Sequence, residues 1–406
     1  MIDVVGMSLS FSALKPRAVV GRALPVLMLL LTAFSSSAQS PQEASNQKPL
    51  TGSERNALAG DMPADPGPRA SKLSGNLRKA KVKAAMRKVA DWQLKRVEDV
   101  YSQDWTFATL DLGLLEASAS LGDPRYADYV RQTAAHYDWT LGPRKGHADD
   151  HAIGQSYLWL DRMNPDQHHL AAMRTVFEEQ MQRADDPSKP VWWWCDALFM
   201  APPAWSGLAE VTHDDRYLAY MDRQWHITAG LLWDEKQHLF SRDARYLDKH
   251  ERNGEKVFWS RGNGWVMGGL VRLLETLPAT DPRRPFYEEK FRQMTEKVRS
   301  IQGEDGLWRM GLLDAASYPN AEVSGSAFFV YATAWGISHG VLERKTYLPV
   351  VERGWRGLVA NVYADGRLGS IQPVGDAPGA YTPGSSYVFG VGAFLLAGGE
   401  VEALSR

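Results

Sequence analysis

The segment DPRYADYV, residues 123–130, has two partial copies further along the chain, DDRYLAYM at 214–221 and DPRRPFY at 281–287. Each begins with an aspartate suited to cap a helix, and Pro or Asp follows in the first turn. Each also comes directly after a segment rich in small and aliphatic residues. This recurrence predicts a fold built from repeated pairs of helices.

Apolar residues recur at helical spacing throughout the chain from about residue 76 onward. The segments predicted to be helical are 76–99, 105–121, 125–141, 150–162, 167–183, 196–212, 215–231, 261–277, 284–301, 324–340, 345–361 and 386–402. Strand-like sequence is confined to the gaps between them, at 238–248 and 306–312.

Alternate segments differ in composition, which predicts two layers. The even-numbered segments carry Gly, Ala and Ser, as in NGWVMGGLVRLL, whereas the odd-numbered ones carry more charge, as in RKAKVKAAMRKVADWQLKR. Helix pairs form either an open solenoid or a closed ring. Six pairs of alternating type favour the ring, an all-α (α/α)6 toroid whose even-numbered helices line the inside.

The first residues have the pattern of an export signal. Basic residues precede the apolar run at 23–34, and Ser36 and Ala38 follow at positions suited to cleavage. We therefore expect a signal peptide at 1–38, an exported protein, in a bacterial periplasm or secreted, and no stable membrane insertion after cleavage. Residues 39–73, rich in Pro, Ser and charge, are expected to form a disordered linker, and 74–404 the catalytic domain.

Composition limits the classes of partner. The 406-residue chain has a net charge of −2, which gives no electrostatic case for nucleic acid. Its 15 Trp and 15 Tyr residues favour carbohydrate, because flat aromatic faces suit sugar rings. The single cysteine, Cys195, excludes an intramolecular disulfide and is interpreted as a buried packing residue rather than a nucleophile.

Several polar residues fall at the starts of the predicted inner helices. In a ring of antiparallel pairs the inner helices are mutually parallel, so their N-termini share one rim. Helix capping would explain each residue taken alone, because Asp and Ser are common caps. It does not explain why tryptophans fall at the same rim, and together they predict a sugar-sized cavity. The polar residues are Asp150, Asp196, Arg261, Ser324 and Ser386, and the tryptophans are Trp105, Trp192, Trp193, Trp194, Trp259 and Trp265.

The stretch VWWWCDALFMAPPAW, residues 191–205, places Asp196 at the end of the tryptophan run. A poorly solvated carboxyl group has a raised pKa, which suits it to general acid catalysis near neutral pH. Asp150 supplies a second carboxylate, and two acids in a sugar-sized pocket are typical of glycosidases. The prolines at 202–203 are expected to interrupt the helix that follows.

Five segments resemble glycoside hydrolase family 105, the unsaturated rhamnogalacturonyl and related unsaturated glucuronyl hydrolases. The resemblance covers 75–402 in the family's motif order. The segments are WWWCDALFMAPPAWSGLAEVT, DDHAIGQ, WSRGNGWVMGGL, EVSGSAFFVYA and SSYVFGVGAFLLAGGE.

The resemblance implies an (α/α)6 toroid without metal or cofactor. It implies a substrate oligosaccharide with a 4,5-unsaturated uronic acid at its non-reducing end. Such enzymes hydrate the double bond instead of attacking the anomeric carbon. By similarity Asp196 is the general acid and base, and Asp150 or its neighbour Asp149 holds the sugar hydroxyls. Residues expected to bind substrate are Asp149, Trp194, Arg242, Arg261, Trp265 and Ser324.

The chain departs from the family pattern at LFSRDARY, residues 239–246, where many members have a histidine-containing segment. Arg242 and Asp243 occupy that place. Arg242 is suited to pair with the substrate carboxylate through a charge-assisted contact. The alternative is an Arg–Asp pair on the surface.

Other chemistries are less favoured by the sequence. His147 and His151 with the adjacent aspartates form a possible metal cluster, but no distant ligand set completes it. Sugar epimerases on the same toroid need paired histidines, and the inner segments carry few, His151 and His339 among them. A non-catalytic glycan-binding protein is the alternative from another class.

Overall fold

The computed structural model describes residues 51–186 and 188–405. The predicted signal peptide, and residues 39–50 of the predicted linker, lie outside the described residues. Within those residues no helix is long and apolar enough to cross a membrane.

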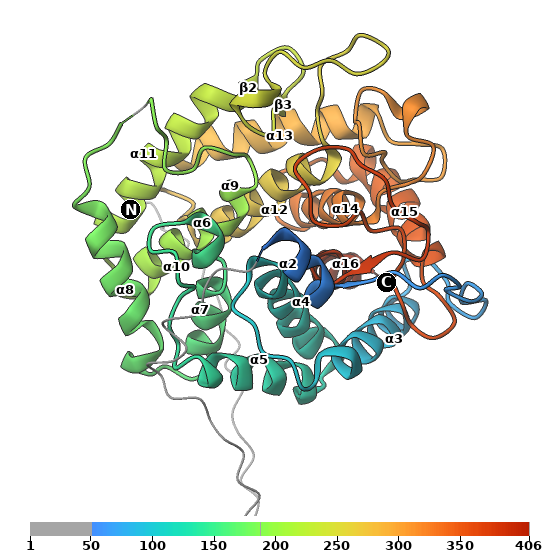
Figure 1. The fold of residues 1–406 in the computed structure, drawn as a ribbon, viewed down its shortest axis with the longest axis horizontal. Helices are drawn as coiled ribbons and strands as arrows, with labels where there is room; N and C mark the ends of the chain where they lie inside the picture. Colours follow the sequence, from blue (N-terminus) through green and yellow to red (C-terminus); the bar gives the residue numbers. More distant parts are fainter. Residues whose placement is uncertain (1–50, 187, 406) are drawn as a thin grey trace, which may run out of the picture. The chain divides into compact units, whose positions relative to one another are not determined.

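Among the described residues six inner helices form a closed ring, which Figure 1 shows end-on. Each packs against the next, and the last packs against the first. In α14 and α16 almost every side chain is buried, so these helices are enclosed on all sides. The inner helices are α4 (Trp105–Leu121), α7 (Gly154–Met163), α10 (Pro202–Thr212), α12 (Ser260–Thr276), α14 (Val323–Ser338) and α16 (Val388–Leu404).

Six outer helices surround the ring and are each buried on one face only. This is the amphipathic pattern of a helix that packs on a core and meets solvent. The predicted (α/α)6 toroid, with even-numbered segments inside, is confirmed. The outer helices are α3 (Lys79–Val97), α5 (Pro124–His136), α8 (Gln167–Met181), α11 (Asp215–Leu232), α13 (Arg284–Ser300) and α15 (Arg344–Ala360).

Two inner segments are divided near their N-terminal ends. The short helix α6 (Ala148–His151) precedes α7, and α9 (Ala197–Met200) precedes α10. Pro202 and Pro203 occupy the first turn of α10, where their missing N–H groups leave no helical bond unmade. The predicted interruption is therefore confirmed. Asp149 and Asp150 lie in the short helix α6, and Asp196 directly precedes the short helix α9.

The prediction of a disordered linker at 39–73 is wrong for residues 51–61, which form a helix and a strand. The helix α2 (Gly52–Ala59) begins with a capping box between Thr51 and Glu54. The strand β1 (Gly60–Asp61) then pairs with β4 (Ser386–Tyr387). The polar composition of this segment reflects a helix lying on a protein surface, held by pairing with a strand more than 300 residues away.

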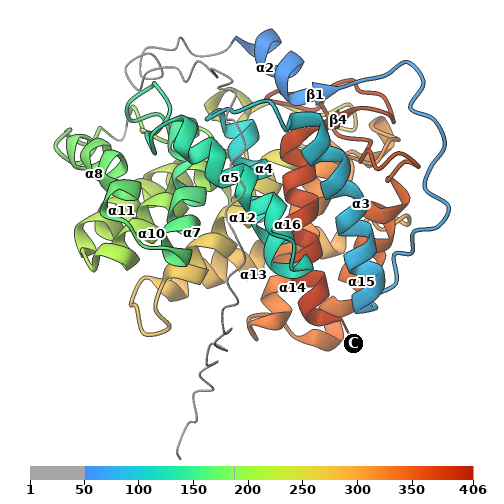
Figure 2. The ribbon, with the colours of Figure 1, turned by 90° about the horizontal axis from the view of Figure 1, so that it is seen from below.

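Figure 2 shows α2, β1 and β4 together at one end of the helical bundle. Because β4 leads directly into α16, this is the end where the inner helices begin. The remaining strands, β2 (Trp233–Asp234) and β3 (Leu239–Phe240), form a hairpin. The 3-10 turns η1 (Ala244–Tyr246) and η2 (Ala315–Ser317) lie in the loops. Strand-like segments were expected at 238–248 and 306–312. Within them, only residues 239–240 form a β-strand, β3.

Candidate active site

The loops at the N-terminal ends of the inner helices bring the predicted residues together. Asp196 directly precedes α9, and Arg242 follows β3. The two segments are joined by a hydrogen bond from the Cys195 N–H to the Arg242 carbonyl, 2.8 Å long. The Nε atom of Arg242 lies 3.4 Å from Oδ2 of Asp196. Arg242, which was predicted to bind the substrate carboxylate but not among the residues expected to converge at the rim, therefore lies beside Asp196.

Asp196 stands at the N-cap position of α9, but its carboxylate does not cap the helix. Its side chain makes no capping hydrogen bond to α9 and accepts one from the Cys195 thiol at 3.4 Å. Burial raises the pKa of Asp196, while the cations of Arg242 and Arg261 oppose that rise. The side chain of Asp196 retains 11% of its surface exposed. Such a group can hold a proton and release it to a bound sugar.

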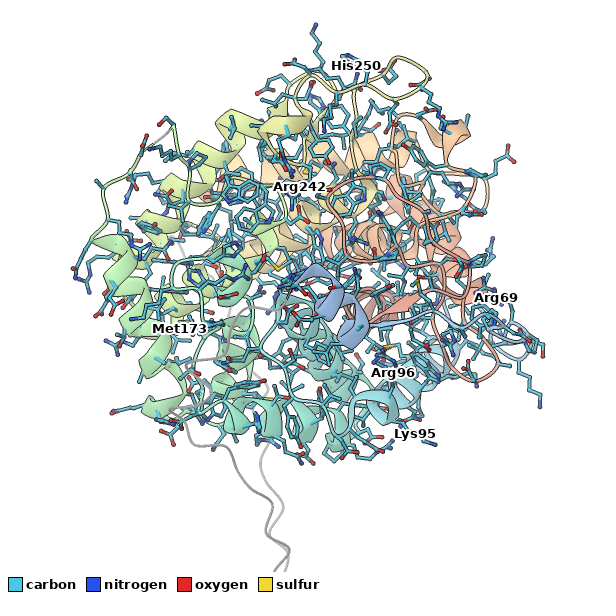
Figure 3. The ribbon with its side chains drawn as sticks, in the orientation of Figure 1. Arg69, Lys95, Arg96, Met173, Arg242 and His250 are labelled. Carbon is cyan, nitrogen blue, oxygen red and sulfur yellow. The ribbon has the colours of Figure 1, made fainter. Side chains whose placement is uncertain are left out.

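Arg242 belongs to the site and not to a surface pair. Only 14% of its side chain is exposed, and it also binds the carboxylate of Asp243 at 2.7 Å. Its guanidinium lies 5.5 Å from the ring centre of Trp193. Figure 3 places Arg242 toward the middle of the molecule, whereas His250 lies at its edge. Residues 239–246, which stand where many family members have a histidine-containing segment, thus place the cation of Arg242 beside Asp196.

Asp150 is paired with Arg144 through several hydrogen bonds. The guanidinium donates from Nη2 to Oδ1 at 2.6 Å and from Nε to both carboxylate oxygens at 3.1 and 3.2 Å. Burial raises the pKa of Asp150, while its hydrogen bonds with Arg144 lower it. An acid held in this way shapes the loop before α6 and is poorly placed to exchange protons.

Asp149 has fewer partners than Asp150. Its carboxylate lies 3.4 Å from the Arg144 Nη2 atom and 3.6 Å from the Nδ1 atom of His147. Burial raises the pKa of Asp149 to about 7, the charge of Arg144 opposes this, and the charge of Asp196 adds to it. The geometry therefore favours Asp149 over Asp150 as the carboxylate that works with Asp196.

The tryptophans do not form the expected cavity wall. Trp265 has no exposed surface and packs among Trp105, Phe199 and Phe328, so its predicted stacking on substrate is wrong for this structure. Trp194 is also buried, at 3% exposure. The exposed ring belongs to Trp193, which keeps 43% of its surface open. The sequence placed three tryptophans in a row, but only the tertiary packing turns one of them outward.

Arg261 and Ser324 are buried beneath the rim and bind other parts of the protein. The Nη1 and Nη2 groups of Arg261 donate to the carbonyls of Gln372 and Pro373, each at 2.7 Å, and the residue is 1% exposed. Ser324 is fully buried and donates to Glu322. Their predicted contact with substrate is therefore wrong. Arg261 holds the loop at Gln372 and Pro373 in place, and Ser324 binds the cap of α14.

The sequence did not single out two residues that organise this rim. Arg144 lies just before the acid pair, and its position in GPRKGHADD is the signal that it could pair with one of them. Glu322 precedes α14 and accepts hydrogen bonds from the N–H groups of Ser324, Gly325 and Gln372. Its place one residue before the helix is that of a cap.

In the described part of the chain, the histidines considered for a metal site or an epimerase site do not form one cluster. His151 is buried beside Phe177, and its Nδ1 accepts from the Trp205 indole. His147 stays with Asp149 at the rim. His339 follows the C-terminal end of α14 and stacks on Trp335, at the opposite end of the inner helices. The paired histidines that an epimerase needs are therefore not brought together.

Two acids and a cation at one rim of an (α/α)6 toroid fit a glycosidase. The family model described as Glycosyl Hydrolase Family 88 matches residues 78–405. The chain belongs to this family, and it is an enzyme.

Three known proteins show how far the similarity extends. The chain is 36% identical to an unsaturated 3S-rhamnoglycuronyl hydrolase of Formosa agariphila, over 81% of this chain and 93% of that protein. The solved structure of a protein named as a polysaccharide lyase has a TM-score of 0.76 and 33% identity, covering 80% of this chain and 98% of that one. A possible family 105 member from Salmonella enterica has a TM-score of 0.67 and 20% identity, covering 80% and 94%. The resemblance to the unsaturated uronyl hydrolases is confirmed.

Proposed function

We propose that the enzyme removes a 4,5-unsaturated uronic acid from the non-reducing end of lyase-generated oligosaccharides by hydrating the C4=C5 double bond. The observation that carries this is Asp196, a buried acid 3.4 Å from Arg242 whose side chain makes no capping hydrogen bond and whose pKa is raised by burial. The name of the Formosa relative supports it and favours a rhamnose as the leaving sugar.

The proposed reaction uses one acid twice. Asp196 gives its proton to C4, and a water molecule adds its oxygen to C5 while its proton returns to Asp196. The product at C5 is a hemiketal, which opens to a ketone and breaks the ring. C1 is then an open-chain hemiacetal, which collapses to an aldehyde and releases the leaving sugar as an alcohol. Asp149 holds the ring hydroxyls, and Arg242 faces the carboxylate on C5.

The test follows the ultraviolet absorbance of the C4=C5 bond with unsaturated disaccharides that carry rhamnose or other leaving sugars. Hydration predicts that absorbance falls with time, fastest with rhamnose. Unchanged absorbance across the panel would refute the proposal. A lyase would instead raise the absorbance of an intact polysaccharide, so the same assay distinguishes hydration from the lyase activity in the name of one structural neighbour.

Replacing Arg242 with glutamine is expected to change the pH dependence of kcat/KM. Activity needs protonated Asp196 and so falls as pH rises through its pKa. The Arg242 cation lowers that pKa, and its removal should move the fall to higher pH. KM should rise about tenfold through loss of a charged contact with the uronate.

The matched control for Arg242→Gln is Arg245→Gln. Arg245 also binds Asp243, at 2.8 Å, but 59% of its side chain is exposed. The pH profile of this control should match that of the wild type. Equal shifts in both variants would mean that Arg242 acts only by holding Asp243.

A further inference from the structure

Asp243 is a buried acid that the proposed mechanism does not use. It directly follows Arg242 and is 1% exposed. Its Oδ1 accepts hydrogen bonds from the N–H and Nε groups of Arg245, 2.8 and 3.0 Å long, and its Oδ2 accepts from Nη2 of the same residue at 2.8 Å. This carboxylate therefore caps the 3-10 turn η1. Capping leaves one contact of Asp243 unexplained, the hydrogen bond from Arg242.

Arg242 lies between two acids, and only one of them binds it. Its Nη1 donates to Oδ2 of Asp243 at 2.7 Å, whereas its Nε lies 3.4 Å from Oδ2 of Asp196. That Nε atom is buried and has no hydrogen-bond partner among the described residues, so the bond to Asp243 is the one that the side chain makes there. A buried N–H group without a partner costs free energy. The guanidinium stays in this place because the charge-assisted bond to Asp243 holds it.

Backbone contacts fix the two acids on either side of Arg242. Trp194 and Asp243 form an antiparallel bridge, and the Cys195 N–H donates to the Arg242 carbonyl at 2.8 Å. The segment that carries Asp243 cannot shift relative to the segment that carries Asp196 without breaking these bonds. The long side chain of Arg242 is the part that can turn between them, and its contact with Asp243 sets its direction.

Asp243 and Arg242 keep their charges while Asp196 titrates. Burial acts to raise the pKa of Asp243, but hydrogen bonds from Arg245 and Arg242 outweigh it and lower the pKa to about 2. Burial acts to lower the pKa of Arg242, but contacts with Asp196 and Asp243 outweigh it and raise the pKa. The other charged or titratable groups that act on Asp196 are Arg261, the Cys195 thiol and Asp149.

We propose that Asp243 is a positioning residue that holds the Arg242 guanidinium beside Asp196 but out of hydrogen-bonding contact with it. Asp196 thereby keeps the proton that it gives to C4, and Arg242 keeps its second terminal amino group for the carboxylate on C5. Asp243, whose side chain is 2% exposed, acts through Arg242 without touching the substrate. The proposal rests on the proposed function and adds to it a residue that sets the pH range of activity.

The test measures the pH profile of kcat/KM for Asp243→Asn on an unsaturated disaccharide, through loss of the C4=C5 absorbance. Without the anion at position 243, Arg242 turns to Asp196 and forms a direct ion pair, which favours the ionised carboxylate and lowers its pKa. The fall in activity should move by about 1 pH unit to lower pH, opposite in direction to the shift of Arg242→Gln. At a fixed pH above the pKa, kcat/KM should fall about tenfold.

The double variant Arg242→Gln/Asp243→Asn shows whether Asp243 acts through Arg242. If it does, loss of Asp243 has no effect once the guanidinium is absent, and the double variant has the pH profile of Arg242→Gln alone. A direct effect of the Asp243 charge on Asp196 would place the fall of the double variant at a lower pH than that of Arg242→Gln. That result would overturn the positioning role.

Asp281→Asn is the matched control. Asp281 accepts from the N–H, Nε and Nη2 groups of Arg283 at 2.9, 2.8 and 2.7 Å, the same three bonds that Arg245 makes to Asp243. It follows the C-terminal end of α12, at the end of the ring away from the active site. Loss of this pair should leave the pH profile unchanged. Thermal unfolding of both variants measures what the shared bonds contribute to stability.

An unchanged pH profile in Asp243→Asn, or a shift to higher pH, would also overturn the role of Asp243. If this variant does not fold, Asp243→Ser makes the same test, because serine can cap η1 without carrying a charge. In each of these cases the wild type still consumes the unsaturated disaccharide, so the proposed function stands. A wild type that consumes none would refute the proposed function itself, and the role of Asp243 with it.

Discussion

Asp196→Asn is expected to lower kcat about 10³-fold or more, because it removes the group that protonates C4. Asparagine has nearly the same shape as aspartate, and the side chain of Asp196 makes no capping hydrogen bond, so the fold should remain. Burial penalises the ionised carboxylate, and the amide has no such penalty. The midpoint of thermal unfolding should therefore stay close to that of the wild type.

The measurement is the initial rate of absorbance loss, with thermal unfolding followed by circular dichroism. The two neighbouring acids are compared in the same assay. Asp149→Asn should reduce the rate with little effect on unfolding, whereas Asp150→Asn should lower the unfolding midpoint because Arg144 loses its main partner. Retention of wild-type activity by Asp196→Asn would remove this residue from the mechanism.

Gly392→Val is expected to have the largest effect on stability. Gly392 lies on α16 where it crosses α4, and the Cα of Gly392 lies 2.6 Å from where a Cβ on Gly113 would stand. A Cβ on Gly392 would overlap the carbonyl oxygen of Thr109, a backbone atom that cannot rotate away. Separating two inner helices of a closed ring disturbs their other neighbours as well. We expect a loss of about 3 kcal/mol in the free energy of unfolding.

The control for Gly392→Val is Gly230→Ala. Gly230 lies in the outer helix α11 with open space where its Cβ would stand. Alanine is the better helix former, so this variant should gain about 0.5–1 kcal/mol. Chemical denaturation of both variants gives the two free energies. If Gly392→Val unfolds at the wild-type denaturant concentration, close packing of α4 and α16 is not needed for the ring.

Much of the fold was predictable because burial has a local signature. The twelve predicted helical segments correspond to the inner and outer helices, with α6 and α9 as the first turns of two of them. Helices enclosed on all sides, such as α14, show as runs of small and apolar residues, and outer ones, such as α3, show charge on one face. Pro202 and Pro203 marked an interruption because proline has the same effect in any fold.

The site was predictable only in part. Asp196 and Arg242 were found because an acid after a tryptophan run, and an arginine in place of a histidine, are visible in the sequence. The exposure of Trp193 and the burial of Trp265 were not, because both depend on which neighbours cover each ring. The sequence also left open whether Asp149 or Asp150 works with Asp196.

The sequence by itself determined the helices, their order and the composition of each layer, since these follow from short-range spacing and residue type. Tertiary structure decided the partner of each charged group at the rim. Arg55 meets Asp104 across 49 residues, and Arg261 meets Gln372 across 111. Such contacts leave no periodic pattern, because the energy of a buried charge depends on what the rest of the chain brings beside it.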